Sequence, residues 1–440
     1  MDTVAIVGFG RFGKTLYQLL KYDFKIVLFD TNKAVFYNYK TELNTIIAKT
    51  LKEIYTAPTI FYAVPISSFE PIIKAHKPYF ANHLLIDVLS VKLHPKQVFS
   101  RYLNNTQTQA LLTHPLFGPD SSQAGFAGLP LVIDKFMASQ QNYLFWKNYF
   151  KSKHLCVIKL SAKQHDQLAA QSQGMAHFIG RLLEQYGYQT TLIDTLGATK
   201  LHEVTKQTCN DTWELFLNLQ NYNPYTKTMR LRLGQSYDKL YNKLLPKRIN
   251  QNYLVFGIQG GKGSFNEEAI LHYAAKQHIH HLKIKYLYTS EKVLRNLHAG
   301  NIDYGVFAIQ NAIGGVVQES TYAMAKYKFK IIHEFAIPIK HFLMKKKTSK
   351  KVTTIIAHPQ VLKQCQSTLK KHYGSYKLVS GKGDLVDTAR AALVLAKNKL
   401  PGNYAILGPK GLADRYNFEI IGKNLQDDKT NNTTFFVVKR

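Results

Sequence analysis

The feature that most constrains the fold is a glycine-rich turn near the start of the chain. Gly8, Gly10 and Gly13 form a GxGxxG pattern between an apolar run, Val4–Phe9, and a helical stretch that ends near Leu20. In such a strand–turn–helix unit the first glycine permits the tight turn and the second lets the backbone approach a pyrophosphate. The third lets the helix pack on the strand. The free N–H groups at the helix N-terminus complete a site for a dinucleotide.

An acidic residue at the expected distance supports a nicotinamide cofactor. Asp30 follows the second apolar run, twenty residues after Gly10, where a carboxylate accepts hydrogen bonds from the adenosine ribose. A carboxylate there repels the 2′-phosphate of NADP, which makes NAD the expected cofactor, although Lys33 lies nearby. Arg11 and Phe12, inside the turn, are assigned to the same cofactor site.

The first 160 residues alternate short apolar runs with helical stretches, which predicts a parallel, doubly wound sheet. The strands are expected at Val4–Phe9, Lys25–Phe29, Thr59–Pro65, Leu84–Leu89, Ala110–Thr113, Leu129–Ile133 and Leu155–Leu160.

The remaining chain divides into two further domains. A capping box at Ser161–Gln164 opens an all-helical region, expected to span residues 161–246. A polar, basic linker follows at 247–252, and strand–helix alternation then resumes over 253–440. We therefore expect an α/β protein with a Rossmann domain over 1–160, a helical domain and a C-terminal α/β domain.

Composition excludes several classes of protein. A hydrophobic content of 45% rules out disorder, and no apolar run reaches the roughly 18 residues of a membrane span. The strand-like Val4–Val7 follows Met1 without a signal peptide, and Cys156, Cys209 and Cys365 form no CxxC pair, so a cytoplasmic protein with reduced thiols is expected. The net charge is +30, but basic residues are scattered along the chain. A surface that steers anionic substrates is therefore favoured over nucleic-acid binding as the primary role.

Two segments place reactive side chains beyond predicted strand ends, where open α/β sheets bind ligands. Ile86–Lys92 contains Ser90, and Thr113–Pro119 contains His114. With the segment from Gln164 to His177, they resemble the prephenate/arogenate dehydrogenase family, most of all its plant-type arogenate branch.

The resemblance covers nearly all of residues 1–225. It implies that hydride leaves C4 of the substrate for nicotinamide, while His114 takes the hydroxyl proton and Ser90 hydrogen-bonds the reacting region. A histidine with a pKa near ~6.5 suits that task at neutral pH.

Other residues of the helical domain are less clearly assigned. Bacterial relatives hold the ring carboxylate with an arginine, and Lys206, five residues before Asp211, would stand in for it here. His177 is a candidate substrate contact, or equally an interface histidine. His165–Asp166 has no second ligand pair at metal spacing, so we interpret it as helix-start structure and expect no metal site.

From Tyr253 the chain resembles prephenate dehydratase, whose fold is two α/β lobes around a cleft. The carrying segments are Gly260–Phe265, Asp303–Val306, Ala308–Asn311, Ile337–His341, His358–Gln360, Asp387–Ala389 and Asn431–Phe435. The resemblance implies that Thr433 is catalytic. It also implies substrate contacts for the residues Ser264, Asn311, Thr388 and Phe435.

Three departures weaken the expectation of dehydratase activity. Thr434 replaces an arginine next to an anionic substrate, and Gln310 and Ala312 replace a glutamate and a serine. Lys262 is a candidate replacement cation. A binding or regulatory module in the same fold therefore stays open as an alternative. The chain ends five residues after Phe435, so we expect no phenylalanine-sensing domain.

The sequence leaves prephenate and arogenate open as the substrate, since the plant-type motifs favour arogenate and the fused dehydratase favours prephenate. A scaffolding protein built on degenerate enzyme domains is less favoured, because the glycine loop, Asp30, Ser90 and His114 are all present. Apolar helix faces in the middle domain predict a homodimer, as the family resemblance also implies. The residues of those faces are Phe178, Leu182, Leu215, Phe216 and Leu219.

Overall fold

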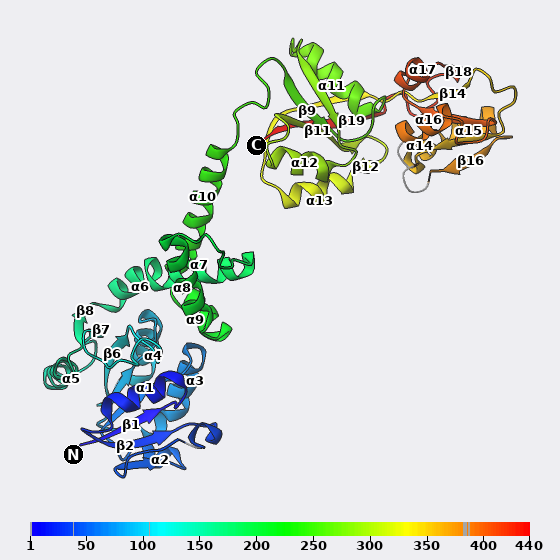
Figure 1. The fold of residues 1–440 in the computed structure, drawn as a ribbon. Helices are drawn as coiled ribbons and strands as arrows, with labels where there is room; N and C mark the ends of the chain where they lie inside the picture. Colours follow the sequence, from blue (N-terminus) through cyan, green and yellow to red (C-terminus); the bar gives the residue numbers. More distant parts are fainter. Residues whose placement is uncertain (1, 38, 105, 382–384, 386–387) are drawn as a thin grey trace. The chain divides into compact units, whose positions relative to one another are not determined.

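A computed structural model describes residues 2–37, 39–104, 106–381, 385 and 388–440 (Figure 1). The chain forms two compact units, residues 1–240 and 241–440. The linker expected at 247–252 lacks helix and strand. None of the described helices combines the length and apolarity of a membrane span.

The N-terminal unit begins with a Rossmann sheet in the order β3-β2-β1-β4-β5-β6-β7-β8. Its inner strands are buried apolar runs, as expected for a sheet covered on both faces, whereas the edge strands β3 and β8 are largely exposed. The strands are β1 (Thr3–Val7), β2 (Lys25–Phe29), β3 (Thr45–Ile47), β4 (Thr59–Tyr62), β5 (Leu84–Asp87), β6 (Gln109–Pro115), β7 (Pro130–Asp134) and β8 (Cys156–Lys159). The helices around it are α1 (Arg11–Leu20), α2 (Leu51–Ile54), α3 (Ile66–His76), α4 (Leu93–Leu103) and α5 (Gln140–Ser152), with two 3-10 turns at Lys33–Phe36 and Lys77–Tyr79.

The expectation of an all-parallel sheet is wrong at one edge. Strands β1 to β6 are parallel, but β7 pairs antiparallel with β6. The reason is that residues 116–129, which join β6 to β7, contain no helix, and a parallel return needs a crossover connection. Strand β3 was not predicted from the sequence. It is a three-residue edge strand with two exposed isoleucines.

The middle of the chain is helical, as expected. The capping box at Ser161–Gln164 is formed, and α7 ends at Gly187 in the left-handed conformation. The helices are α6 (Ala162–Gln171), α7 (Gln173–Tyr186), α8 (Leu196–Cys209), α9 (Trp213–Tyr222) and α10 (Thr226–Leu244).

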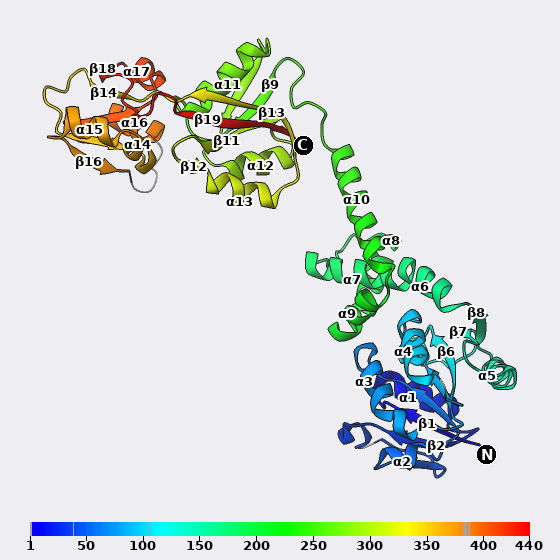
Figure 2. The ribbon, with the colours of Figure 1, turned by 180° about the vertical axis from the view of Figure 1, so that it is seen from behind.

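The C-terminal unit has the two α/β lobes implied by the resemblance. The proximal lobe has a central sheet in the order β10-β9-β11-β19-β13, with β12 beside β11. Its face under α11 is packed by one apolar cluster, and its face under α12 and α13 by another (Figure 2). The elements are β9 (Leu254–Ile258), α11 (Phe265–Lys276), β10 (Leu282–Tyr286), α12 (Ser290–His298), β11 (Tyr304–Asn311), β12 (Gly315–Val316), α13 (Gln318–Lys326), β13 (Lys330–Pro338) and β19 (Asn432–Lys439).

The distal lobe is inserted between β13 and β19, so the chain passes between the lobes twice. Its sheet order is β16-β15-β17-β14-β18. The elements are β14 (Phe342–Lys346), β15 (Thr354–Ala357), α14 (Pro359–Gln364), α15 (Gln366–Tyr373), β16 (Lys377–Ser380), α16 (Thr388–Ala396), β17 (Tyr404–Gly408), α17 (Gly411–Tyr416) and β18 (Phe418–Gly422).

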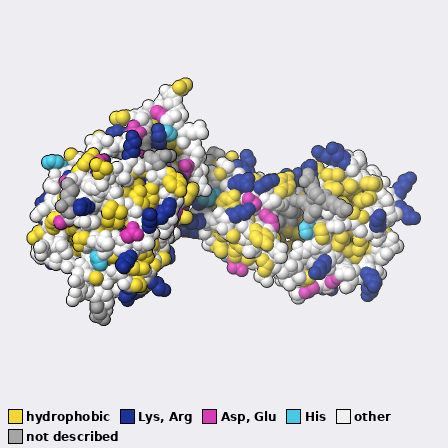
Figure 3. All heavy atoms as spheres, turned by 90° about the horizontal axis from the view of Figure 1, so that it is seen from below, with side chains coloured by type: hydrophobic (Ala, Val, Ile, Leu, Met, Phe, Trp, Pro, Cys, Tyr) yellow, Lys and Arg dark blue, Asp and Glu magenta, His cyan; other side chains and the backbone are white. Residues whose placement is uncertain are grey.

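Basic side chains are dispersed on the molecular surface. On the face shown in Figure 3, lysines and arginines stand among hydrophobic and neutral side chains and do not form one stripe. The charge is nevertheless uneven along the sequence. Residues 241–440 contain 32 Lys and Arg against 12 Asp and Glu, so this unit carries +20 of the total +30.

Candidate active sites

The glycine turn between β1 and α1 has the geometry of a dinucleotide site. Gly8 has φ +94°, and a Cβ on it would lie 2.3 Å from the Ala63 carbonyl oxygen. A Cβ on Gly13 would lie 2.1 Å from the Gly8 carbonyl oxygen, so helix and strand pack here as only glycine allows. A Cβ on Gly10 would meet nothing within 4 Å. Two glycines are thus required by the fold, whereas the third leaves open space at the helix N-terminus.

Asp30 is held at the carboxyl end of β2, next to this turn. Its Oδ2 accepts the Phe9 N–H at 2.7 Å, and its Oδ1 accepts the Asn32 N–H at 2.8 Å. Lys33 is engaged elsewhere, because its Nζ donates to the Ala48 carbonyl at 3.2 Å. The carboxylate therefore stands beside the glycine loop, as a ribose-binding acid requires.

The other two residues of the turn contact neighbouring segments. Arg11 pairs with Asp120 at 3.0 Å and with Asp211 at 3.2 Å, so it links the turn to the helical domain. Phe12 packs near Phe117, with ring centroids 6.3 Å apart.

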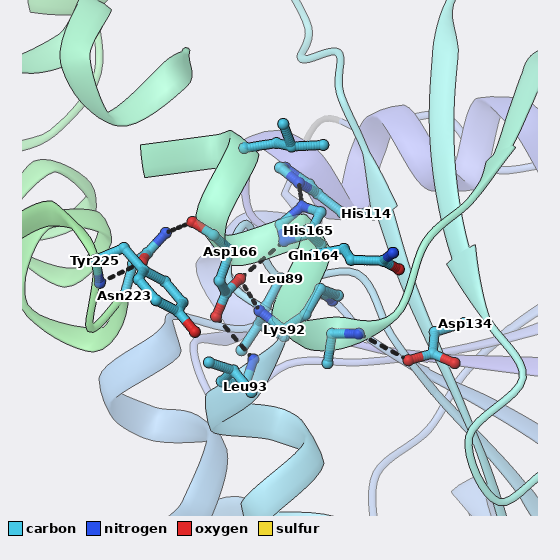
Figure 4. Close-up of polar contacts among 12 residues, drawn as sticks. Leu89, Lys92, Leu93, His114, Asp134, Gln164, His165, Asp166, Asn223 and Tyr225 are labelled. Carbon is cyan, nitrogen blue, oxygen red and sulfur yellow. Dashed lines mark hydrogen bonds and ion pairs between the residues drawn. The ribbon is translucent and has the colours of Figure 1, made fainter. Parts of the chain in front are cut away.

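His114 lies at the end of β6 in a buried row of three polar side chains (Figure 4). Its Nδ1 lies 2.8 Å from Nε2 of His165, and Nδ1 of His165 lies 2.8 Å from Oδ1 of Asp166. The exposed fractions are 3%, 2% and 0% in that order. Burial, His165 and Lys92 place the pKa of His114 well below its ordinary value, so the ring is neutral at neutral pH and can accept a proton.

A buried ion pair lies behind this row. Lys92 Nζ contacts Asp87 Oδ1 at the end of β5 and donates to the Thr113 carbonyl. The backbone N–H groups of Lys92 and Leu93, at the start of α4, donate to Oδ1 and Oδ2 of Asp166 at 2.7 and 2.9 Å. Burial raises the pKa of Asp87 to about 6, opposed by Lys92. Asp166 therefore attaches helix α6 to the start of helix α4, whose Lys92 in turn contacts the ends of β5 and β6, next to His114.

The remaining dehydrogenase candidates are Ser90 in the Rossmann domain and His177 and Lys206 in the helical domain. Ser90 stands in the loop after β5, partly exposed, and the structure gives no hydrogen bond between Ser90 and His114 among the residues it describes. His177 on α7 is buried, with Nε2 4.0 Å from Asp211 Oδ2 and no partner for Nδ1 in the described structure. Burial lowers its pKa, opposed by Asp211. Lys206 is exposed on α8.

A buried arginine that the sequence analysis did not assign lies next to Asp211. Arg181 on α7 donates to the Asp211 carbonyl and stacks 4.8 Å from the Trp213 ring centroid. Its Nε is buried and has no partner among the described residues. Arg181 is thus a second candidate, beside Lys206, for the cation that holds a substrate carboxylate.

In the C-terminal unit, Thr433 begins β19 and belongs to a buried amide network. Asn311, at the end of β11, donates from Nδ2 to Thr433 Oγ1 at 2.9 Å and to Asn431 Oδ1 at 2.8 Å. Gln364 of the distal lobe donates to Asn311 Oδ1 at 2.8 Å and lies 2.8 Å from His341 Nε2. The Thr433 hydroxyl accepts one hydrogen bond, which leaves its own proton available for donation.

The other dehydratase candidates are spread around this network. Ser264 precedes α11, and its Oγ is buried with no partner in the described structure, while Lys262 in the same loop is exposed. Thr388 begins α16 and is partly buried. Phe435 is 1% exposed in the core of the proximal lobe, which favours a packing role over the predicted substrate contact. Asp387, from the same motif as Thr388, lies outside the described residues.

The sequence interpretation did not find the role of His165 and Asp166. Both were interpreted as helix-start structure, and Asp166 does fasten that helix. Their contact with His114 spans 51 positions, so no local spacing could reveal it. In the described part of the chain, no group of three or more His, Cys, Asp or Glu side chains is placed to bind a metal ion.

Comparison with known proteins identifies three segments. Residues 19–133 match the family "Prephenate dehydrogenase, nucleotide-binding domain". Residues 182–253 match "TYRAAT1-like, C-terminal domain", and residues 256–440 match "Prephenate dehydratase".

Curated relatives divide in the same way. Arogenate dehydrogenase 2, chloroplastic, of Arabidopsis thaliana is 29% identical over 263 residues, which are 57% of this chain and 72% of that protein. The prephenate dehydratase of Methanocaldococcus jannaschii is 34% identical over 139 residues, 31% of this chain and 48% of that protein. The chain thus spans about half of the archaeal enzyme.

Two solved structures are matched at TM-scores below 0.5. A prephenate dehydrogenase from A. aeolicus in complex with hydroxyphenyl propionate and NAD+ has a TM-score of 0.45 at 15% identity, covering 63% of this chain and 93% of that one. A prephenate dehydratase from Arthrobacter aurescens in complex with L-Phe has a TM-score of 0.38 at 21% identity, covering 42% and 60%. By these sequence matches, residues 19–133 are similar to the nucleotide-binding domain of prephenate dehydrogenase, and residues 256–440 are similar to prephenate dehydratase.

Proposed function

We propose that the N-terminal unit oxidises and decarboxylates arogenate or prephenate with NAD as cofactor. The observation that carries this proposal is the placement of a neutral, buried histidine, His114, at the carboxyl end of β6, in a sheet whose first turn has the geometry of a dinucleotide site. When bound, the nicotinamide supplies the acceptor for the hydride from C4 of the substrate.

The residues around the cofactor site perform the other tasks. The backbone at Gly10 leaves space for the pyrophosphate, and Asp30 accepts hydrogen bonds from the ribose hydroxyls. His114 takes the proton of the substrate hydroxyl as the ring C4–O bond becomes a carbonyl. Loss of CO2 then makes the ring aromatic. Burial of His114 keeps bulk water away from this transfer.

The ring carboxylate of the substrate needs a cation in the helical domain. Arg181 and Lys206 are the two candidates. Arg181 is buried beside Asp211, and its Nε has no partner among the described residues, although its Nη1 already pairs with Glu184 at 2.9 Å. A substrate carboxylate would therefore bind at Nε and compete with Glu184. The names of the plant relatives favour arogenate as the substrate of this unit.

We extend the proposal to the C-terminal unit, which would dehydrate and decarboxylate the same class of substrate. The carrying observation is the Thr433 hydroxyl, which Asn311 holds at the junction of the two lobes. In this reaction the hydroxyl leaves as water, so a proton donor is needed at the leaving oxygen. The Thr433 hydroxyl is positioned for that task.

A binding module is the second candidate for this unit. Thr433 is surrounded by neutral amides, Asn311, Asn431 and Gln364, and Thr434 replaces the expected arginine. One charge-assisted hydrogen bond to a substrate carboxylate is worth about 1.5–3 kcal/mol. Its loss leaves weaker substrate binding unless another cation, such as Lys262, replaces it.

Full-length variants separate the two activities. His114→Asn should remove NADH formation while keeping the product made without NAD, and Thr433→Ala should do the reverse. Thr434→Arg should raise dehydration if only that contact was lost. If no variant, including Thr434→Arg, makes phenylalanine or phenylpyruvate, the C-terminal unit is a binding module. If wild type forms no NADH with either substrate, the dehydrogenase proposal fails.

We also propose a homodimer through the helical domain. Leu182 and Leu215 are exposed as the sequence predicts, whereas Phe216 and Leu219 are buried within the unit. Further exposed apolar side chains extend the surface on α8, α9 and α10; these are Leu196, Leu217, Leu231 and Tyr237. A second copy is the occupant that the family resemblance implies.

A further inference from the structure

His165 is buried between the imidazole of His114 and the carboxylate of Asp166. On one side is Nδ1 of His114 and on the other is Oδ1 of Asp166, each at 2.8 Å (Figure 4). His114 comes from strand β6, and His165 and Asp166 come from helix α6. The row therefore joins the Rossmann sheet to the helical domain within one unit.

The hydrogen bonds of Asp166 fix the direction of the whole row. Its two oxygens accept the backbone N–H groups of Lys92 and Leu93, which fits an ionised carboxylate, a group that can only accept. Nδ1 of His165 must therefore carry the proton. In a neutral imidazole the other nitrogen is then an acceptor, so Nε2 of His165 receives a proton from Nδ1 of His114.

The consequence concerns the opposite nitrogen of His114. With its proton on Nδ1, neutral His114 has its lone pair on Nε2. We infer that His165 and Asp166 are positioning residues that set His114 in this tautomer and stabilise the positive charge that it gains. This inference rests on the proposed role of His114 as the base.

The step balances with NAD, the cofactor of the proposed function, which would accept the hydride from C4. The O–H bond of the substrate hydroxyl breaks, its electron pair forms the C4–O double bond, and an N–H bond forms at His114 Nε2. The resulting positive charge is shared across the Nδ1–Nε2 hydrogen bond with His165, while Asp166 stays ionised. The charged group that acts on both imidazoles, besides Asp166 on His165, is Lys92, which itself pairs with Asp87.

Asp166→Asn is the most informative variant. The amide has one oxygen where the carboxylate has two, yet three N–H groups point at this side chain: those of the Lys92 and Leu93 backbone and that of His165 Nδ1. If its NH2 faces His165, both imidazoles switch tautomer, and Nε2 of His114 carries a proton that blocks the reaction. In hydrolytic triads the same exchange lowers turnover about 10⁴-fold. Here kcat should fall at least 100-fold, with KM changed by less than about threefold.

Two further variants give the matched comparison. His165→Gln keeps an oxygen that can accept from His114 Nδ1 but cannot share the charge, so its kcat should lie between wild type and Asp166→Asn. Asp134→Asn makes the same change of charge near the start of α6, where an amide oxygen can still accept the Ala162 N–H. Its kcat should stay within about twofold of wild type.

The deciding measurement is nitrogen NMR of the full-length, 15N-histidine-labelled protein with and without NAD, with His114 assigned by the His114→Asn difference. We expect His114 to be protonated at Nδ1 and bare at Nε2 near pH 7.5, and this pattern to reverse in Asp166→Asn. A proton on Nε2 in wild type would overturn the inference even if the variant fails to fold, and so would unchanged kcat in folded Asp166→Asn. The expected tautomer in a protein without dehydrogenase activity would instead refute the proposed function and leave the arrangement of the row intact.

Discussion

Two single-methyl substitutions in the glycine loop should have opposite effects on stability and on cofactor binding. Gly10→Ala adds a Cβ that meets nothing within 4 Å, at φ −71°, a value that alanine readily adopts. Gly13→Ala adds a Cβ 2.1 Å from the Gly8 carbonyl oxygen, about 1 Å closer than real Cβ contacts allow. The first change should leave folding intact, and the second should separate helix α1 from strand β1.

The magnitudes follow from these contacts. Relieving an overlap of this kind costs about 1–3 kcal/mol. At roughly 2–4 °C per kcal/mol for a unit of this size, Gly13→Ala should lower the Tm by about 2–12 °C. Gly10→Ala should lose at least one charge-assisted hydrogen bond to the pyrophosphate, worth about 1.5–3 kcal/mol. That loss raises the Kd for NAD by roughly 10- to 150-fold.

The assay is thermal unfolding together with calorimetric titration of NAD, applied to both variants and wild type. We expect Gly10→Ala to melt within about 1 °C of wild type and to bind NAD weakly. Normal NAD affinity in Gly10→Ala would refute the assignment of this turn as the cofactor cradle. A wild-type Tm in Gly13→Ala would contradict the packing argument.

Four further predictions come from single residues. His114→Asn should lower dehydrogenase kcat about 100-fold or more with Kd for NAD unchanged, and near-normal turnover would remove it from the mechanism. Asp30 should make kcat/KM higher with NAD than with NADP, and Asp30→Ala should reduce the difference between the two kcat/KM values. A clear NADP preference in wild type would refute the role of this carboxylate. Leu182→Glu should shift the sedimentation equilibrium of the proposed dimer towards monomer, and a strictly monomeric wild type at micromolar concentration would contradict that dimer. Burial lowers the pKa of His341 to about 4, so the unfolded state binds a proton at this histidine before the folded state does as the pH falls below 6.5. Urea unfolding should therefore show a free energy of unfolding that decreases by up to about 3 kcal/mol between pH 6.5 and 4. The decrease should be smaller in His341→Gln.

The parts of the fold that could be predicted from sequence are those with a strong local signal. Buried parallel strands read as continuous apolar runs, and the glycine turn and the capping box of α6 are short motifs with specific geometry. Strand β3 has no such signal, because it is short and lies at a sheet edge. Strand β7 was predicted, but its antiparallel direction was missed because apolar runs do not indicate direction.

In the candidate sites, too, the residues with a local sequence signal were found and those without one were missed. His114 was found because a strand end and a motif coincide, whereas its partner His165 is 51 residues away and looks like an ordinary first-turn helix residue. Arg181 was not assigned a role from the sequence, since its approach to Asp211 depends on the packing of helix α7 against the segment before α9. Contacts between distant segments, and not residue types, are what the sequence could not supply.

The central claim is that one chain carries two activities on one class of substrate. The direct measurement is product analysis of purified full-length protein incubated with arogenate or prephenate, with and without NAD. We predict tyrosine or 4-hydroxyphenylpyruvate, with stoichiometric NADH, only when NAD is present, and phenylalanine or phenylpyruvate when it is absent. Absence of either product pair, with arogenate and with prephenate alike, would contradict the account.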